Sequence, residues 1–331
     1  MSADLERAYK GARVLVAGGL GFIGSALAHR LVALGAEVAI VDALDPEGGG
    51  SEANIADIRS RVRPERADLR DGARVAPLLA GCSHVFNLAG RTSHMGSLAD
   101  PLADLGANTE AALALLELVR ARAPGAAILY ASTRQVYGAP ERLPVDETHP
   151  LHPPDPNAVA KIAGESYHLL YHRLHGLGAT VLRLTNVYGP RMRIKDARQN
   201  FLGLWVRRVL EGAPVEVWGG TQRRDLAYVD DVVDAFLVAA ARGGVAGRAY
   251  NVGGAPAVSL AELARLIVAA NGGGRIETRD FPPERRAIDI GDYETDDRLF
   301  RETTGWSPRV ELGDGLARTL EFFRPRLKDY L

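Results

Sequence analysis

Residues 18–25 read Gly-Gly-Leu-Gly-Phe-Ile-Gly-Ser and lie between an apolar run at 14–17 and a helical pattern at 26–34. Gly18, Gly21 and Gly24 allow a strand to turn sharply into a helix, a backbone to approach a pyrophosphate, and the helix to pack closely on the strand. The amino end of the helix then offers free N–H groups and a positive dipole to an anion. The stretch therefore predicts a dinucleotide-binding turn.

An acidic residue follows at the distance that such a turn requires. Asp42 closes a second apolar run, residues 37–41, and lies about 20 residues beyond the glycines, where a carboxylate accepts ribose hydroxyls. No Arg or Lys follows within the next several residues to bind a 2′-phosphate. We therefore expect NAD, and not NADP, as the cofactor. The alternative is that Asp42 merely ends a strand.

The composition is that of an ordinary globular protein. The chain has 331 residues, 47% hydrophobic and 24% charged, and a formal net charge of −1. So small a net charge gives no global field for nucleic acid, and any basic site must be local. We therefore expect no nucleic-acid partner, and the length suggests about two domains.

Cysteine usage and apolar runs bear on the compartment. The single cysteine, Cys82, excludes an internal disulfide framework and a cysteine-rich zinc site, which indicates a reducing compartment. The first residues contain acids and no apolar core of signal-peptide length, and no apolar run approaches the ~18 residues of a membrane span. We therefore expect a cytoplasmic protein with no membrane partner and no metal.

Short apolar runs alternate with amphipathic stretches over the first 190 residues. The runs lie at 13–17, 37–41, 84–88, 126–131 and 179–184, and the stretches at 22–34, 71–80, 101–123 and 157–176. This alternation predicts an α/β fold with a Rossmann-type, doubly wound parallel sheet. Ligands of such sheets bind beyond the carboxyl ends of the strands, so the loops that follow these runs should line one crevice.

Beyond residue 190 the segments become shorter and turn residues more frequent. A strand-like segment at 215–217 and helix-like stretches at 230–242, 259–271 and 312–323 indicate a smaller C-terminal α/β lobe for the substrate. We expect the NAD-binding domain mainly over residues 1–190 and the smaller lobe mainly over 191–331. Segments of chain can exchange between the two lobes.

Small residues and hydroxyls follow the runs at 84–88 and 126–131. The two loops read Asn-Leu-Ala-Gly-Arg-Thr-Ser-His at 87–94 and Ala-Ser-Thr-Arg-Gln-Val-Tyr-Gly at 131–138. With them, the chain resembles an extended short-chain dehydrogenase/reductase of the nucleotide-sugar epimerase/dehydratase family, nearly end to end. The matching pieces, in order, are Gly18–Gly24, Asp42, Asp68-Leu69, Asn87–Gly90, Asn108, Ser132–Gly138, Lys161, Arg183–Arg191, Arg224–Asp231, Asn251–Gly254 and Gly305–Pro308.

The resemblance implies a set of cofactor contacts. Asp68 and Leu69 would border the adenine, Asn108 would steady a loop along the cofactor, and Lys161 would hydrogen-bond the nicotinamide ribose. The Lys161 ammonium would also lower the pKa of a neighbouring acid or base. A solvated lysine in the first turn of a helix is the alternative for Lys161. The full set is Gly18, Gly21, Phe22, Ile23, Gly24, Asp42, Asp68, Leu69, Leu88, Ala89, Gly90, Asn108 and Lys161.

One catalytic position departs from the family. The resemblance implies that Thr133 hydrogen-bonds the reacting sugar hydroxyl, and that a Tyr four positions before Lys161 removes its proton. That position is Asn157, and a carboxamide cannot act as a general base. We expect Thr133, Lys161 and Asn157 at the catalytic position, with the proton relayed by another group. The candidates are Thr133, His94, a bound water, Tyr137, Tyr167 and Tyr188.

The other half of the expected site is cationic. Guanidinium groups fork onto phosphate oxygens, so arginines from separate segments can clamp a diphosphate. A set of surface arginines is the alternative. His94 lies in a loop that contacts substrate in the family, although a lone loop histidine is more often solvated. The expected substrate-binding residues are His94, Thr133, Asn186, Arg191, Arg224 and Arg285.

The residues after Thr133 bear on the reaction. Family 4,6-dehydratases carry an Asp-Glu pair there, where this chain has Arg134 and Gln135. We therefore expect an NAD-dependent epimerase-like enzyme that removes and returns hydride at a sugar carbon, most directly C4. The alternatives are another sugar-modifying activity, a dehydratase or a decarboxylase with Arg193 or Lys195 at the carboxylate, or a catalytically weak nucleotide-sugar and NAD-binding protein.

The family also implies an assembly. Its members pair two helices from each subunit, here around 101–123 and 157–176, so a homodimer is expected beside the nucleotide-diphosphate-sugar partner. Apolar residues on these stretches fit a dimer face and fit core packing equally; they are Leu113, Leu115, Leu116, Leu169 and Leu170.

Overall fold

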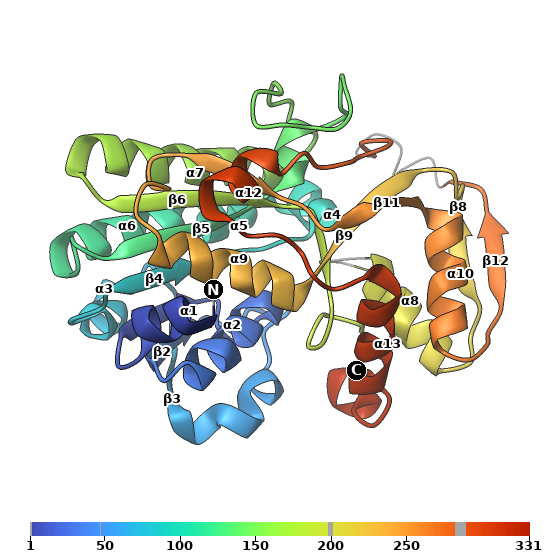
Figure 1. The fold of residues 1–331 in the computed structure, drawn as a ribbon, viewed down its shortest axis with the longest axis horizontal. Helices are drawn as coiled ribbons and strands as arrows, with labels where there is room; N and C mark the ends of the chain where they lie inside the picture. Colours follow the sequence, from blue (N-terminus) through green and yellow to red (C-terminus); the bar gives the residue numbers. More distant parts are fainter. Residues whose placement is uncertain (1, 47, 198–200, 282–288) are drawn as a thin grey trace.

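The larger part of the molecule is built on a seven-stranded parallel sheet (Figure 1). The computed structural model describes residues 2–46, 48–197, 201–281 and 289–331. The strand order is β10-β6-β5-β4-β1-β2-β3, and every neighbouring pair is parallel. The strands are β1 (Arg13–Ala17), β2 (Glu37–Asp42), β3 (Val62–Arg66), β4 (His84–Asn87), β5 (Ala127–Thr133), β6 (Gly178–Leu184) and β10 (Ala249–Val252).

The chain winds outward from β1 to β3 and then returns to β4 on the other side of β1. At such a reversal the connections leave the two neighbouring strands toward opposite faces, so a crevice opens at their carboxyl ends. This arrangement confirms the predicted Rossmann-type α/β fold.

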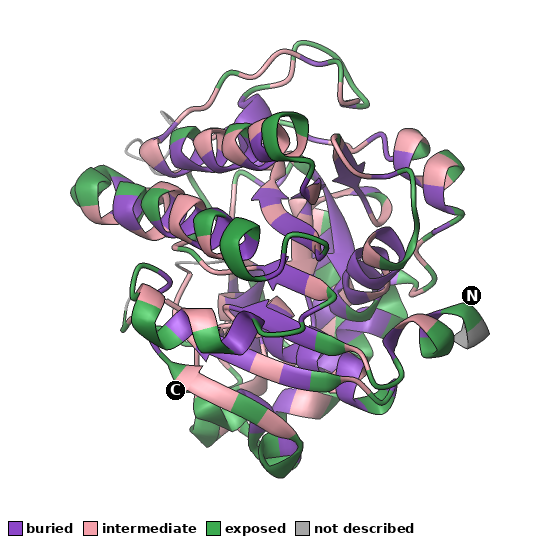
Figure 2. Ribbon diagram, turned by 90° about the vertical axis from the view of Figure 1, so that its left-hand side faces the viewer, coloured by how far each residue is buried: buried purple, intermediate pink, exposed green. Residues whose placement is uncertain are grey.

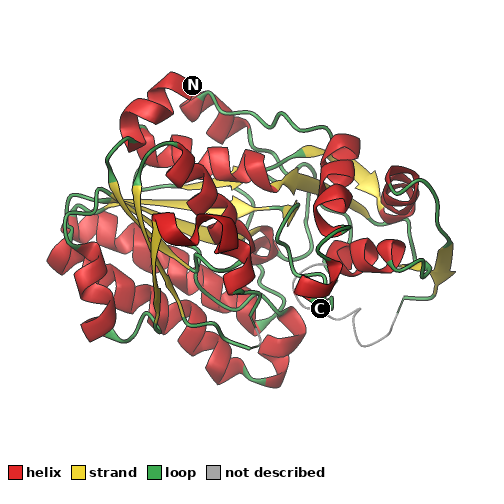
Figure 3. Cartoon of the chain, turned by 90° about the horizontal axis from the view of Figure 1, so that it is seen from below, coloured by secondary structure: helices red, strands yellow, loops and turns green. Residues whose placement is uncertain are grey.

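Alternate residues of β1 face two different cores. Val14 and Val16 pack on one side of the sheet, and Leu15 and Ala17 on the other. The first core is covered by α1 (Ser2–Tyr9), α2 (Phe22–Ala33) and α9 (Val229–Ala241), and the second by α6 (Ala111–Arg122) with α7 (Pro156–His175). Burial on both faces explains the continuous apolar runs in the sequence. Figure 2 shows that the strands are largely buried, and Figure 3 shows the strands with helices packed around them.

The chain also contains short helical segments, most of which lie between strands of this sheet. The stretch expected as one helix at 101–123 is divided into α5 (Pro101–Leu105), a π-helical turn, η3 (Gly106–Glu110), and α6. The others are η1 (Glu52–Arg61), α3 (Gly72–Val75), η2 (Ala76–Leu79), α4 (His94–Ala99), η4 (Arg134–Tyr137), α12 (Arg298–Thr304) and η5 (Leu327–Tyr330).

A smaller group of elements lies at the right of Figure 1 around its own core. One small sheet has the order β11-β9-β7, and β12 pairs with β8 in a second. The strands are β7 (Asn186–Tyr188), β8 (Val215–Trp218), β9 (Arg223–Tyr228), β11 (Ala255–Ser259) and β12 (Ile276–Arg279), and the helices are α8 (Phe201–Leu210), α10 (Leu260–Ala270) and α13 (Leu312–Phe323).

Two segments beyond residue 190 return to the larger part of the molecule, one as a helix packed on the seven-stranded sheet and one as a strand of that sheet. The helix expected at 230–242 in the smaller lobe forms as α9, but its Val232 and Phe236 pack in the core under the large sheet, and β10 pairs with β6. That placement corrects the expectation for this helix. The division of the chain near residue 190 stays a prediction.

Two strands of the sheet carried no usable sequence signal. β3 reads Val-Arg-Pro-Glu-Arg and is partly exposed; as the outermost strand it tolerates proline and charge. β10 has only four residues and lies at the opposite edge of the sheet. In the described part of the chain, no helix has the length and apolar character needed to cross a membrane.

Candidate active site

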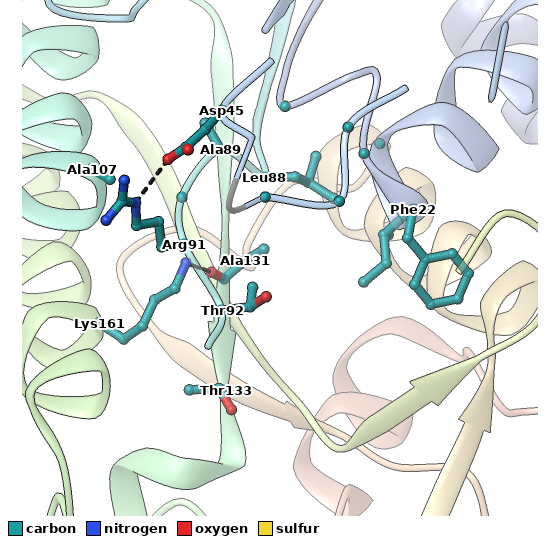
Figure 4. A pocket seen from close by; sticks show the side chains of 18 of the residues that line it. Phe22, Asp45, Leu88, Ala89, Arg91, Thr92, Ala107, Ala131, Thr133 and Lys161 are labelled. Atoms are coloured by element: carbon teal, nitrogen blue, oxygen red, sulfur yellow. Dashed lines mark hydrogen bonds and ion pairs between the residues drawn. The ribbon is translucent and has the colours of Figure 1, made fainter. Parts of the chain in front are cut away.

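A cleft of 430 Å³ lies at the carboxyl ends of β1, β2, β4 and β5 (Figure 4). Its position is the one expected for a doubly wound sheet. Residues 184–187, Met192 and Arg193 also line it. Most residues predicted for the site line it, namely Gly18, Gly21, Phe22, Ile23, Gly24, Asp42, Asp68, Leu69, Leu88, Ala89, Gly90, His94, Thr133, Asn157, Lys161 and Asn186.

The glycine-rich turn is packed too tightly for side chains. A Cβ on Gly24 would lie 2.1 Å from the carbonyl oxygen of Gly18, and one on Gly18, whose φ is +76°, would lie 2.7 Å from the Leu88 backbone. Gly21 caps α2 without a side-chain hydrogen bond. The first N–H groups of α2 therefore stay available to an anionic group in the cleft.

Asp42 is held at the end of β2 by the turn itself. Its Oδ2 accepts from the backbone N–H of Leu20 at 3.0 Å, and its Oδ1 from that of Leu44 at 2.9 Å. Burial raises the pKa of this carboxyl, while the backbone hydrogen bonds from Leu44, Leu20 and Gly21 oppose that shift. The fixed carboxylate faces a cleft with room for ribose hydroxyls.

Asp68 and Asn108 lie at two further points along this side of the cleft. Asp68 binds Arg70 through both carboxylate oxygens, at 2.9 and 2.7 Å. Asn108 does not line the cleft; it is buried behind Gly90, where a Cβ on Gly90 would lie 2.2 Å from the Asn108 Oδ1. The close contact between Gly90 and Asn108 leaves no room for a side chain at this point of the loop after β4.

Lys161 reaches from α7 to the end of β5, as Figure 4 shows. Its Nζ donates to the carbonyl of Ala131 at 3.1 Å and lies 5.0 Å from the centre of the Tyr130 ring. Burial lowers the pKa of Lys161 to about 8, although the charges of Asp104 and Glu165 oppose the shift. An ammonium has three donors, so this group can still donate to a ligand in the cleft.

Asn157 binds two neighbours with its side-chain amide. Nδ2 donates to the carbonyl of Arg91 at 2.8 Å and to Oδ1 of the buried Asp104 at 2.9 Å. Both amide hydrogens are thereby used to join α7, α5 and the loop after β4. Sequence reasoning missed Asp104, because nothing in its local pattern indicates that α5 brings a carboxylate under this loop.

Thr133 ends β5 at the edge of the cleft. Its Oγ1 accepts from the backbone N–H of Gln135 at 3.2 Å, which leaves the hydroxyl hydrogen free to turn toward a ligand. In Figure 4, Thr133 lies further along the strand that presents Ala131 to Lys161.

His94 and Asp155 form a pair at the same end of the cleft. The Nδ1 of His94 lies 2.9 Å from the Oδ2 of Asp155. Asp155 also caps α7 by accepting from the N–H of Ala158 at 2.9 Å. The sequence Asp155-Pro156 before a helical pattern is a recognisable helix start, but the partner of the capping carboxylate could not be read from it.

Arg134 and Asn186 meet across the cleft. Arg134 Nη2 donates to Asn186 Oδ1 at 3.2 Å, and its guanidinium lies 5.0 Å from the centre of the Tyr293 ring. Burial, followed by the charge of Arg224, lowers the pKa of Arg134 to about 10. A cation therefore stands immediately after the hydroxyl residue.

Two of the other predicted arginines are not brought to the cleft. Arg224 is buried and pairs with Asp289 Oδ1 at 2.9 Å, and Arg191 donates to the carbonyl of Asn54 at 3.2 Å. Neither lines the cleft, and Arg285 lies outside the described residues. Their role at a diphosphate stays a prediction.

The tyrosines considered as proton acceptors do not line the cleft. The Tyr137 hydroxyl donates to Asn251 Oδ1 at 2.7 Å and accepts from Arg183 Nη1 at 2.9 Å. Tyr188 is buried against the carbonyl of Leu312, and Tyr167 packs against the second core. Within the described ranges, no group of three or more His, Cys, Asp or Glu side chains could hold a metal ion.

Comparison with known proteins places this architecture among sugar-nucleotide enzymes. Residues 14–253 match the NAD dependent epimerase/dehydratase family. The chain is 34% identical over 315 residues to a UDP-glucose 4-epimerase from Mycolicibacterium smegmatis, covering 94% of this chain and 98% of that protein.

Two solved structures share the fold. A Thermotoga maritima UDP-glucose 4-epimerase, solved with UDP-glucose, superposes with a TM-score of 0.86 and 30% identity over 95% of this chain and 99% of its own. A Streptomyces venezuelae dTDP-glucose 4,6-dehydratase, solved with NAD bound, also has a TM-score of 0.86, with 27% identity over 96% and 98% of the two chains.

Proposed function

The chain belongs to the NAD-dependent epimerase/dehydratase family, and from that premise we propose that it is an epimerase-like enzyme that inverts a hydroxyl-bearing carbon of a nucleotide-diphosphate sugar, at C4. Hydride would leave that carbon and return to its opposite face. The reaction needs a cofactor, a group that holds the hydroxyl and a group that takes its proton.

The cleft fits NAD. The uncapped N-terminus of α2 suits the pyrophosphate, Asp42 suits the adenosine ribose, and Lys161 has donors to spare for the nicotinamide ribose. When bound, NAD supplies the acceptor and later the donor of hydride. The protein would orient it through the glycine turn and keep positive charge beside it through Lys161.

The residues after Thr133 favour epimerisation over water loss. Water loss from a sugar ring needs an acid to protonate the leaving hydroxyl, and the two positions after Thr133 hold Arg134 and Gln135. Both are engaged, Arg134 with Asn186 and Gln135 Nε2 with Asp155 Oδ2 at 3.4 Å. This substitution carries the preference, because hydride removal and return require no such acid.

Decarboxylation of a uronic acid has less support. Arg193, one of the two residues considered for a carboxylate beside Lys195, binds Asp196 with two nitrogens at 2.8 and 2.7 Å. Its charge is therefore neutralised within the chain. Dehydration and decarboxylation remain as outcomes of the test below.

The test is a panel of UDP-, dTDP- and GDP-sugars incubated with the purified protein and NAD. We expect one of them to give its C4 epimer, with transient absorbance at 340 nm from reduced cofactor in the protein. Thr133→Val should lower kcat by about 10²- to 10⁴-fold and Thr133→Ser by far less, because only serine retains the hydroxyl. Binding of a sugar with neither reduction nor product would instead establish a nucleotide-sugar-binding protein.

We also propose a homodimer formed through α5, α6 and α7. Large apolar side chains on these helices are exposed, among them Leu102 at 77% and Leu174 at 62%. Leu115 and Leu116 are fully buried in the chain's own core, so of the two alternatives left open for them the structure supports core packing. Light scattering should give twice the monomer mass, and Leu102→Arg with Leu174→Arg should halve it.

A further inference from the structure

One nitrogen of the His94 ring lies beside a buried carboxylate. Its Nδ1 faces Asp155 at 2.9 Å, and the side chains are 31% and 0% exposed, respectively. His94 lines the cleft together with Thr133 and Asn157. Among the residues that the structure describes, no side chain pairs with Nε2, so that nitrogen can face a ligand.

The surroundings of Asp155 favour its ionised form. Burial opposes its ionisation, but hydrogen bonding and charge from His94, with the N–H of Ala158, hold its pKa below the usual range. A carboxylate that binds one imidazole nitrogen fixes the ring and stabilises the imidazolium that forms when the other nitrogen takes a proton.

One residue joins this pair to the hydroxyl of Thr133. The backbone N–H of Gln135 donates to Thr133 Oγ1 at 3.2 Å, and the side chain of Gln135 reaches Asp155 Oδ2 at 3.4 Å. Asn157, two residues after Asp155, secures the carbonyl of Arg91 in the loop that leads to His94. The same end of the cleft therefore holds the hydroxyl residue, the imidazole and the clamp on its loop.

We propose that His94 is the general base of this enzyme and that Asp155 is its positioning residue. The inference rests on the proposed function. His94 Nε2 would take the proton of the sugar hydroxyl while the carbon gives up a hydride, for which bound NAD would supply the acceptor; the carbon would thereby lose two electrons and become a carbonyl. When hydride returns to the opposite face of that carbon, His94 would give the proton back.

Other charges near this end of the cleft already have partners. Lys161 on α7 binds the carbonyl of Ala131, Asp104 on α5 binds Asn157, and Arg91 pairs with Asp45 Oδ2 at 2.7 Å. Arg134, on η4, binds Asn186. Asp155 is the acid that pairs with the His94 ring, so its removal should change His94 more than its neighbours.

The first test is His94→Gln, with the exposed His152→Gln as the control. We expect kcat to fall by about 10²- to 10⁴-fold. The Kd for the nucleotide sugar should stay within about threefold of the wild-type value, and the NAD content and the unfolding midpoint should be unchanged. His94→Ala should regain activity with added imidazole.

The second test is Asp155→Asn, read without turnover. Asparagine is also a good helix N-cap, so α7 should form. The Cε1–H resonance that disappears in His94→Gln identifies His94 in NMR spectra of wild-type protein. In Asp155→Asn this resonance should move to a different chemical shift at a fixed pH, because the ring has lost the carboxylate beside its Nδ1.

Each outcome decides one of the two proposals. Full activity of His94→Gln would exclude His94 as the base while leaving the epimerase intact. An unchanged His94 resonance in Asp155→Asn would exclude the pairing. A wild-type protein that turns over no sugar in the panel, yet shows the Asp155-dependent change of this resonance, would overturn the proposed function and the base assignment, and leave the pairing itself standing.

Discussion

The two walls of the cleft are built in different ways. The wall from β1 and β2 is made of backbone: a glycine turn with no room for a Cβ, free N–H groups at α2, and one carboxylate held by main-chain donors. The opposite wall is made of side chains from separate segments, with His94, Thr133 and Asn157 lining the cleft. Asp155 and Asp104 lie behind them, against His94 and Asn157, and these residues meet only in the folded chain. A backbone wall tolerates no added atom, whereas a side-chain wall can change its chemistry one residue at a time.

The largest expected effect comes from adding one atom to the backbone wall. Gly24→Ala puts a Cβ 2.1 Å from the Gly18 carbonyl oxygen, whereas Gly125 has nothing within 4 Å. We expect Gly24→Ala to lose at least about 3 kcal/mol of unfolding free energy and most of its NAD. Gly125→Ala should behave as the wild type in urea unfolding and in NAD content, and a stable, NAD-loaded Gly24→Ala would break the comparison.

Lys161, at the boundary of the two walls, should make stability depend on pH. Its pKa falls from 10.5 to about 8 on folding, so the unfolded chain binds more protons between those values and stability rises with pH there, by up to about 3 kcal/mol. Lys161→Met buries no charge and should lack this rise. Its unfolding free energy should therefore exceed that of the wild type by less at pH 10.5 than at pH 8. Urea unfolding at several pH values measures this difference. An unfolding free energy that changes with pH equally in the two proteins would contradict the prediction.

The same lysine bears on activity. Above about pH 8 the free enzyme loses the ammonium charge, so kcat/KM should fall on the alkaline side. Lys161→Met should have low activity and no such limb. Unchanged turnover in that variant would show that Lys161 has no role in the reaction.

Asn157→Tyr tests how far the side-chain wall can be altered. The substitution removes both amide hydrogen bonds and leaves the buried Asp104 without this partner, which should cost about 1–3 kcal/mol. We expect activity to change without being abolished, because His94 remains. Val159→Tyr, at a position 53% exposed on the same helix, controls for the added ring, and a folded but inactive Asn157→Tyr would contradict the prediction.

The smallest effect is expected at Asp68. Its pair with Arg70 is half-exposed, and such pairs contribute about 0–1 kcal/mol. Asp68→Asn should therefore leave the unfolding free energy nearly unchanged and weaken NAD only a few-fold by calorimetry. Glu110→Gln removes the other partner of Arg70, outside the cleft, and should leave NAD affinity unchanged.

The backbone wall could be predicted from sequence because its determinants are local. Glycine spacing, an acid at a fixed offset and alternating apolar runs are properties of consecutive residues, and they led to the sheet and to Gly18, Gly24 and Asp42. The pairing of His94 with Asp155 spans 61 residues of chain, and Asp104 reaches Asn157 across 53. No periodicity encodes such pairs.

The resemblance to the family was limited in the same way, because it did not show which side chains pair in the folded chain. It placed Thr133, Asn157 and Lys161 at the cleft, yet it also led to Arg224, whose charge the structure places against Asp289. Whether a guanidinium is free for a ligand depends on which carboxylate the fold brings beside it. β3 escaped prediction for the opposite reason, because an edge strand needs no apolar pattern.

The return of α9 and β10 to the large sheet limits how this protein can be recombined. A chimera joined at residue 190, meant to exchange the substrate half for that of another enzyme, would take with it the strand that covers the edge of β6 and the helix that fills the space beneath β5. New specificities on this scaffold are therefore expected to arise by point changes in the loops, and a crossover that respects the fold would need at least three junctions.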